Sequence, residues 1–139
     1  YTTRDVLANA DLVTYLPIWE GLGNALLEAI AAKVPVVTTT YLVYKTDIGI
    51  MKFKNVEIRD VYGEDGMLVI PDEALESMYT LITDSAVRKE AVERNFEIAA
   101  REFGYQTLKH RLEQILTDYG DEIRASRKRI AKSKQAYSV

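Results

Sequence analysis

Two short β-prone runs, with a helical pattern between them, leave few folds open to this chain. The first run spans residues 12–16 (Leu-Val-Thr-Tyr-Leu) and the second spans residues 35–39 (Pro-Val-Val-Thr-Thr). A helical pattern fills residues 24–33 between them, and another covers residues 3–10. This alternation is typical of parallel strands that are joined by crossover helices. We therefore expect an α/β fold with a parallel sheet.

The second half of the chain is predominantly helical. Short strands are expected at residues 56–58 and 68–70, and three amphipathic helices follow. Asp72 and Asp84 are placed to cap the first two of these helices, and Gly120 is expected to end the third. The apolar residues that the first of the three should turn toward the core are Leu75, Met78, Tyr79 and Ile82.

The composition fits one soluble domain. The chain has 139 residues, of which 47% are hydrophobic and 28% are charged, which suffices for a single core. It contains no cysteine, which excludes disulfides, thiolate metal ligands and cysteine nucleophiles. No apolar run approaches the ~20 residues that cross a bilayer. No signal peptide is visible, so a cytoplasmic location is expected.

Charge is distributed unevenly along the chain. Residues 121–139 carry six Lys or Arg side chains against two acids, a net charge of +4. The whole chain has a net charge of −3, so residues 1–120 carry −7, and no nucleic acid is expected as the main partner. We expect a domain over residues 1–119 and a basic tail over residues 120–139. A basic tail can make peripheral contact with an anionic membrane, but composition favours a solvated helix or disorder.

The segment 17–28 leads from the end of a predicted strand into a helix. Ligands of open α/β sheets bind at the carboxyl ends of the strands, so its position makes it a candidate site. Gly21 and Gly23 let the backbone approach a ligand closely, and the helix N-terminus attracts a diphosphate. Glu20 and Glu28 can each accept two hydrogen bonds from hydroxyl groups, as the paired hydroxyls of a sugar require.

A purely structural explanation of the same residues is nearly as strong. A glycine-rich turn before a helix occurs throughout α/β domains. In that interpretation Asn24 is only an N-cap, and Glu20 and Glu28 are solvated acids on a loop and a helix.

The spacing of Glu20 and Glu28 resembles the E-x7-E motif of the family-4 retaining glycosyltransferases, which have the GT-B fold. Residues 7–12 (LANADL) are similar to the run before the family's strand, and residues 27–37 (LEAIAAKVPVV) are similar to its LEAMAxGxPVV run. Further matches, in the family's order, are residues 68–71, Asp84, Arg88, Phe103 and Leu108. The resemblance covers roughly residues 5–118. It implies the second half of a Rossmann-like, donor-binding domain with C-terminal helices.

The resemblance implies a role for each matched residue. Glu20 matches the acid that contacts hydroxyls of the donor sugar, and it is the catalytic residue expected in this segment. Glu28 matches the acid that binds the nucleotide ribose. The loop that touches the sugar and the diphosphate matches Gly21, Leu22, Gly23 and Asn24. Family members transfer a hexose from a nucleotide sugar with retention, and they generally require no metal or other cofactor.

The chain departs from the family pattern at two places. Lys33 stands where the family often has glycine. Residues 41–47 (YLVYKTD) replace a glycine-rich segment that ends in an acid, with Asp47 in the place of that acid. The family's basic pair for the diphosphate, its base-binding strands and its acceptor domain lie upstream and have no counterpart here. The chain also begins at Tyr1, so we expect the upstream part of the same polypeptide to be a partner, and the segment alone to be inactive.

Other functions fit parts of the pattern. Gly21 and Gly23 after a strand suit a dinucleotide-binding oxidoreductase, but Leu26 occupies the third glycine position of that fingerprint. A non-catalytic nucleotide-sugar-binding or regulatory domain of the same fold stays open as the alternative. For a glycosyltransferase, UDP-glucose and GDP-mannose are both compatible donors, and the acceptor is unknown.

Overall fold

A computed structural model of the chain describes residues 2–59 and 62–136, except for the side chains of residues 132–136. The chain divides into two compact units, residues 1–102 and residues 103–139. The first unit holds the sheet and the candidate site, and the second is a single long helix with its flanking residues.

The sheet confirms the predicted parallel α/β fold. Its strands are β1 (Val13–Tyr15), β2 (Val36–Thr39) and β3 (Val56–Ile58), in the order β1-β2-β3. Both strand pairs are parallel, and Val37 in the middle of the sheet lies opposite Val56. All four residues of β2 are buried, as expected for a central strand that is covered on both faces.

The α-helices of the described residues are α1 (Thr3–Leu7), α2 (Asn24–Ala31), α3 (Asp72–Thr83), α4 (Ser85–Phe103) and α5 (Tyr105–Ala136). A π-helical segment, Tyr44–Ile48, and a 3-10 turn, Gly49–Met51, follow β2. The predicted strand at residues 68–70 is absent. Leu68 makes only an isolated antiparallel bridge with Tyr62.

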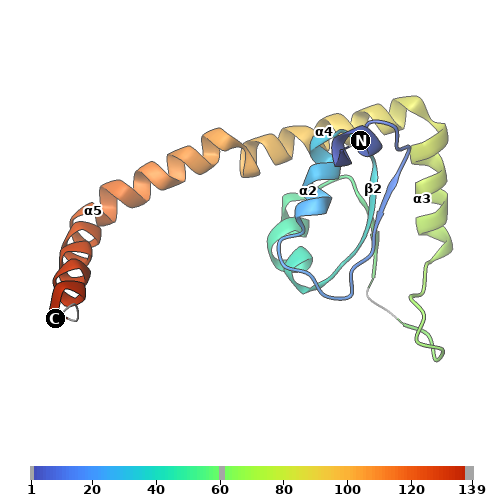
Figure 1. The fold of residues 1–139 in the computed structure, drawn as a ribbon. Helices are drawn as coiled ribbons and strands as arrows, with labels where there is room; N and C mark the ends of the chain where they lie inside the picture. The colour runs from blue at the N-terminus through green and yellow to red at the C-terminus, as the bar shows by residue number, and fades with distance from the viewer. Residues whose placement is uncertain (1, 60–61, 137–139) are drawn as a thin grey trace. The chain divides into compact units, whose positions relative to one another are not determined.

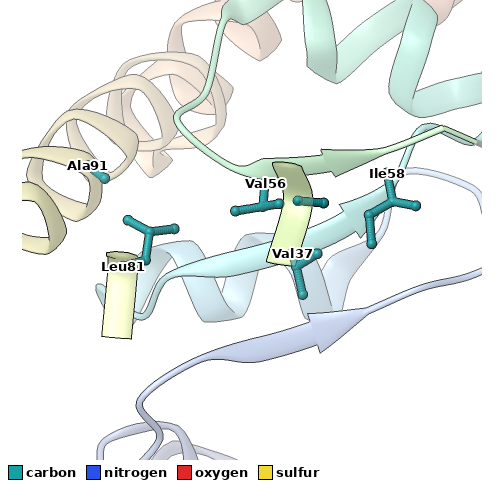
Figure 2. Packing of buried hydrophobic residues seen from close by; sticks show 6 residues of the cluster. Val37, Val56, Ile58, Leu81 and Ala91 are labelled. Atoms are coloured by element: carbon teal, nitrogen blue, oxygen red, sulfur yellow. The ribbon is translucent and has the colours of Figure 1, made fainter. Parts of the chain in front are cut away.

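Helices cover both faces of the sheet, and Figure 1 shows α2 and α3 on either side of β2. Leu26, Ala29 and Ile30 form the buried face of α2. The cluster under α3 and α4 consists of Val37, Val56, Ile58, Ala74, Leu81 and Ala91. Figure 2 shows its strand residues gathered beside Leu81 and Ala91. Successive residues of a strand point to opposite faces, so Val37 faces this cluster while the buried Val36 faces the other side.

Two predictions about α3 are wrong. Asp72 is the first residue of the helix, Pro71 is its N-cap, and no side chain caps it. Three of the four residues predicted to face the core are also solvent-exposed: Leu75, Tyr79 and Ile82 are 49%, 69% and 46% exposed. The fourth, Met78, is partly buried and packs against the core cluster, as predicted. The helix has a second apolar stripe, Ala74, Met78 and Leu81, at the same helical spacing. This second stripe packs on the sheet, and the small Ala74 side chain lets the helix approach closely.

The cap predicted for α4 is confirmed, whereas the predicted end of α5 is wrong. The Asp84 carboxylate accepts hydrogen bonds from the backbone N–H groups of Ala86 and Val87, at 2.9 and 3.1 Å. Helix α5 continues through Gly120 to Ala136, because one glycine inside a helix costs only about 1 kcal/mol relative to alanine. The predicted division into a domain over residues 1–119 and a tail stays a prediction.

Candidate functional site

The candidate site lies where β1 ends and α2 begins. Residues 16–23 form the loop, and Gly23 is the N-cap of α2, with φ 81° and ψ 65° and no side-chain cap. The prediction that Asn24 is the cap is therefore wrong, because Asn24 is the first helical residue. The turn into the helix requires a left-handed residue, which glycine adopts without strain. Among the described residues, no side chain caps the N–H groups at the start of this helix.

The two glycines of the loop differ in what the fold requires of them. A Cβ atom at Gly23 would lie 2.6 Å from the Tyr41 hydroxyl oxygen and 3.3 Å from the Tyr15 hydroxyl oxygen. Close packing and a positive φ therefore both demand glycine at position 23. At Gly21 a Cβ atom would meet nothing within 4 Å, and φ is not positive. Packing among the described residues therefore gives no reason for glycine at position 21.

Glu20 is half-buried, and the chain fixes its carboxylate at both oxygens. Oε2 accepts a hydrogen bond from the Tyr15 hydroxyl at 2.8 Å, and Oε1 accepts one from the Gly21 N–H at 2.7 Å. Burial, and then the hydrogen bond to Glu20, raise the pKa of the Tyr15 hydroxyl above its ordinary value of 10.0. Tyr15 therefore stays a neutral donor at physiological pH, and Glu20 keeps lone pairs free for further hydroxyl groups.

A group of buried or half-buried tyrosines behind the loop was missed by the sequence analysis. The rings of Tyr15 and Tyr41 meet edge to face with their centroids 6.4 Å apart, and Tyr44 lies 5.7 Å from Tyr41. The Tyr41 hydroxyl also donates a long hydrogen bond, 3.5 Å, to the Leu22 carbonyl. One signal was available: Tyr15 ends β1 and Tyr41 follows β2 by two residues. The carboxyl ends of parallel strands meet at one edge of the sheet.

The start of the loop is tied to β2. The Thr39 hydroxyl, at the end of that strand, donates a hydrogen bond to the Pro17 carbonyl at 2.5 Å. Between this anchor and Gly23, the loop exposes its apolar side chains, and Trp19 is 79% exposed. The backbone of the loop is therefore held at both ends, while its apolar side chains are exposed to solvent.

Glu28 lies apart from this network, on the second turn of α2, and its side chain is exposed. It lines a groove of about 550 Å³ between α1 and α2, together with Arg4, Leu7 and Ala32 among others. A larger groove of about 890 Å³ lies between β3 and α3 and includes none of the predicted site residues. The smaller groove therefore contains Glu28 but none of the loop residues 20–24.

The departure from the family pattern at Lys33 has a structural explanation. Lys33 follows the end of α2 with φ 58°, and the N–H of Val34 donates to the carbonyl of Ala29 at 3.1 Å. This is the Schellman arrangement, in which glycine is the usual left-handed residue. Lysine is held there by contacts of its side chain, whose Nζ lies 2.6 Å from the Glu93 carboxylate and 4.7 Å from the centre of the Phe96 ring.

Two general observations bear on ligands. Within residues 2–59 and 62–136, no three His, Cys, Asp or Glu side chains are grouped as metal ligands; the expectation that no metal is needed stays a prediction. In the same part of the chain, no helix is both long and apolar enough to span a membrane.

Asp47 is exposed in the π-helical segment, and its expected role also stays a prediction.

Comparison with known proteins identifies the family that the chain resembles. The family described as "Glycosyl transferases group 1" matches residues 2–84. Mannosylglucosylglycerate synthase of Thermotoga maritima is 42% identical over 113 residues, which are 78% of this chain and 26% of that protein. The protein of the same name in Petrotoga mobilis is 50% identical over 58 residues, which are 42% of this chain and 14% of that protein. No solved structure matches the chain.

The family match covers more than half of the chain and includes β1, the glycine loop, Glu20, Glu28 and β2. The chain spans about a quarter of the length of the longer-matching relative. The parallel sheet and the helix that follows the cap at Gly23 are those expected of a C-terminal glycosyltransferase domain with a GT-B fold. The chain belongs to the group 1 glycosyltransferases.

Proposed function

We propose that the full-length protein transfers a hexosyl group from a nucleotide-sugar donor to an acceptor, and that the loop from Glu20 to Asn24 binds the donor. The observation that carries this proposal is the fixed carboxylate of Glu20 beside a helix N-terminus that no side chain caps. A sugar diphosphate needs both features: hydroxyl acceptors for the sugar and N–H donors for the phosphates. Membership of the glycosyltransferase family supports the same assignment.

Each part of the donor has a place in this proposal. The sugar hydroxyls bind the Glu20 carboxylate, which is the catalytic residue of the segment. The N–H of Leu27 donates to the Gly23 carbonyl at 3.2 Å, which is the first backbone hydrogen bond of the helix. The diphosphate binds the N–H groups that precede Leu27. The ribose binds Glu28 in the groove beside α1. The basic partners of the diphosphate come from an upstream part of the polypeptide.

The names of the relatives narrow the substrates. Both matched relatives are mannosylglucosylglycerate synthases, so we propose that this protein attaches a mannosyl group to make a mannosylated glucosylglycerate. Of the two donors compatible with the sequence, this product favours GDP-mannose over UDP-glucose. Retention of configuration and independence of a metal follow from the family resemblance and are part of the proposal.

The test is a transfer assay on the full-length protein. GDP-mannose and UDP-glucose are each incubated with glucosylglycerate, with and without EDTA. We expect mannosyl transfer from GDP-mannose, no loss of activity with EDTA, and the anomeric configuration of the donor in the product by NMR. The proposal would be refuted if the protein neither transferred a sugar from GDP-mannose or UDP-glucose nor bound either donor.

The alternative, a non-catalytic domain, is distinguished by measuring donor binding alongside transfer. A domain that only binds nucleotide sugars would show donor binding by calorimetry without product or hydrolysis. The fixed position of Glu20 favours the enzyme, because a pre-oriented carboxylate is what a reacting sugar requires.

A further inference from the structure

The hydroxyl of Tyr15 has no place in the proposed reaction, yet it donates a hydrogen bond to the Glu20 carboxylate. Tyr15 is the last residue of β1, so a strand of the sheet fixes its backbone. Its hydroxyl donates to Glu20 Oε2 at 2.8 Å across only five residues of chain. A hydrogen bond to a charged group is stronger than one between neutral groups. The bond therefore ties a loop side chain to the rigid part of the fold.

Without this bond, little would orient the Glu20 side chain. Its other oxygen accepts from the N–H of the next residue, Gly21, at 2.7 Å, and that local contact moves with the loop. The nearby loop side chains of Trp19 and Leu22 are exposed to solvent. Tyr15 is itself held by the ring of Tyr41, which is buried against Gly23. A chain of contacts thus runs from the sheet through Tyr15 to the carboxylate.

We propose that Tyr15 is a positioning residue, which orients the Glu20 carboxylate toward paired hydroxyls of the donor sugar. This inference rests on the proposed function of the loop. Tyr15 does not touch the donor and acts only through Glu20. Its effect therefore falls on the sugar part of the donor, whereas binding of the nucleoside diphosphate, which Glu20 does not contact, is independent of it.

The chain offers a matched control for this idea. The Tyr44 hydroxyl donates to a second carboxylate, Glu57 Oε1, also at 2.8 Å. Glu57 lies in β3, two strands away from the loop. Tyr15→Phe and Tyr44→Phe therefore each remove one hydroxyl from the same tyrosine group and one hydrogen bond to a glutamate. Tyr44→Phe also removes a longer bond from the Asn55 amide, at 3.4 Å, but only Tyr15→Phe removes a hydrogen bond to the glycine loop.

The test compares the two variants in the full-length protein. For Tyr15→Phe we expect kcat/KM for the nucleotide-sugar donor to fall roughly 10-fold or more, with inhibition by the nucleoside diphosphate unchanged. Tyr44→Phe should leave both quantities unchanged. In a Glu20→Gln background, Tyr15→Phe should have little further effect, because both changes act on one interaction.

Each other result counts against the inference. Wild-type kinetics in Tyr15→Phe would overturn it. An equal loss of donor and nucleoside diphosphate binding, or equal losses in the two Tyr→Phe variants, would mean that the hydroxyl only stabilises the fold. If the wild-type protein binds no nucleotide sugar at all, the proposed function fails first, and that outcome is visible before any variant is made.

Discussion

Glu20 and Glu28 share a motif but differ in how firmly the chain holds them. Glu20 is half-buried with both oxygens hydrogen-bonded, while Glu28 is exposed on the helix surface. Substitution should therefore separate their roles. Glu20→Gln should lower kcat by roughly 10–100-fold, the value of a hydrogen bond to a charged group that strengthens during the reaction. Glu28→Gln should raise KM by a similar factor and leave kcat nearly unchanged.

Steady-state kinetics with the donor varied would check this separation. Glu90→Gln is a suitable control, because Glu90 is an exposed acid of α4 to which no role in the site is assigned. If Glu20→Gln raised only KM, or if Glu28→Gln lowered only kcat, the roles would be reversed. Normal kinetics in both variants would mean that the donor binds elsewhere.

The tyrosines behind the loop predict a pH dependence of stability. Burial is the largest cause that raises the pKa values of Tyr15, Tyr41 and Tyr44 above the ordinary 10.0. Above about pH 10 the unfolded chain then releases these protons before the folded chain does. The unfolded state binds fewer protons, so the free energy of unfolding falls as pH rises. Below pH 10 the same groups contribute their full stabilisation.

Urea unfolding at a series of pH values, from about pH 9 to about pH 12, measures this slope. Tyr15→Phe removes one of the titrating groups and should make the decline shallower. A free energy of unfolding that stays flat across this range would show that the tyrosines ionise as readily in the folded protein as in the unfolded chain.

The sequence predicted the acids of the site but not their surroundings. Glu20, Gly21 and Gly23 are recognisable because their spacing is local in the chain. Tyr15 and Tyr41 are brought together by the pairing of β1 with β2, which hydrophobic periodicity does not encode. Whether a glycine is needed for its φ or for space also depends on neighbours from other elements, as the contrast between Gly23 and Gly21 shows.

At the scale of elements, the three strands of the sheet followed from the pattern, whereas the strand expected at residues 68–70, the caps expected at Asn24 and Asp72, and one helix face did not. The helix α3 has two apolar stripes of equal periodicity, and only the position of the sheet decides that Ala74 and Leu81 are buried. Helix α5 is longer than predicted, because Gly120 does not end it. A glycine in a helix lowers stability without ending the helix when helix-forming residues flank it.

Two lysines with φ 58° give a matched test of backbone strain. Lys52→Gly relieves a left-handed conformation that costs an L-residue about 1–2 kcal/mol, and the flexibility of glycine in the unfolded chain offsets about 0.4–1 kcal/mol of this gain. We expect a net stabilisation of about 0.5–1 kcal/mol. Lys33→Gly gains the same relief, but it also loses the half-exposed ion pair with Glu93 and the contact with Phe96. Each of these is worth at most about 1 kcal/mol, so its net effect should be near zero or unfavourable.

Urea unfolding of the two variants would check the difference between them. An equal gain in both variants would mean that the contacts of Lys33 contribute nothing to stability. A loss in Lys52→Gly would mean that its left-handed conformation is not strained.

At the scale of the whole molecule, the described chain presents several apolar surfaces to solvent. The side chains of α3 named above form one of them. In α5 a second stripe consists of Tyr105, Leu108, Leu112, Ile115, Leu116, Tyr119, Ile123 and Ile130, all exposed. The third is β1, which has no strand partner on its outer side among the residues that the structure describes. Surfaces of this kind mark interaction sites, and the longer-matching relative is about four times the length of the matched segment.

The outer edge of β1 is the surface most suited to pairing with another strand, because its backbone N–H and carbonyl groups need hydrogen-bond partners. The N–H of Val13 donates to Pro35 at 2.9 Å, toward β2. Backbone groups alternate sides along a strand, so the N–H and carbonyl of Thr14 point outward. We predict that residues 1–139, produced by themselves, self-associate through this edge. Thr14→Pro removes the outward donor and keeps the bonds to β2, since proline is tolerated on the open side of an edge strand. It should shift the protein toward monomer.

Sedimentation velocity at several protein concentrations would measure this shift, with Leu116→Lys as the control on the apolar stripe of α5. A lysine there disrupts association through α5 but leaves the β1 edge unchanged. If the chain associates through β1, Leu116→Lys should therefore leave the monomer fraction nearly unchanged. The opposite pattern, in which Leu116→Lys gives monomers and Thr14→Pro does not, would place the self-association on α5. A wild-type chain that is monomeric at every concentration would show that the β1 edge does not drive association. In that case the free backbone groups of Thr14 would have to be satisfied by water alone.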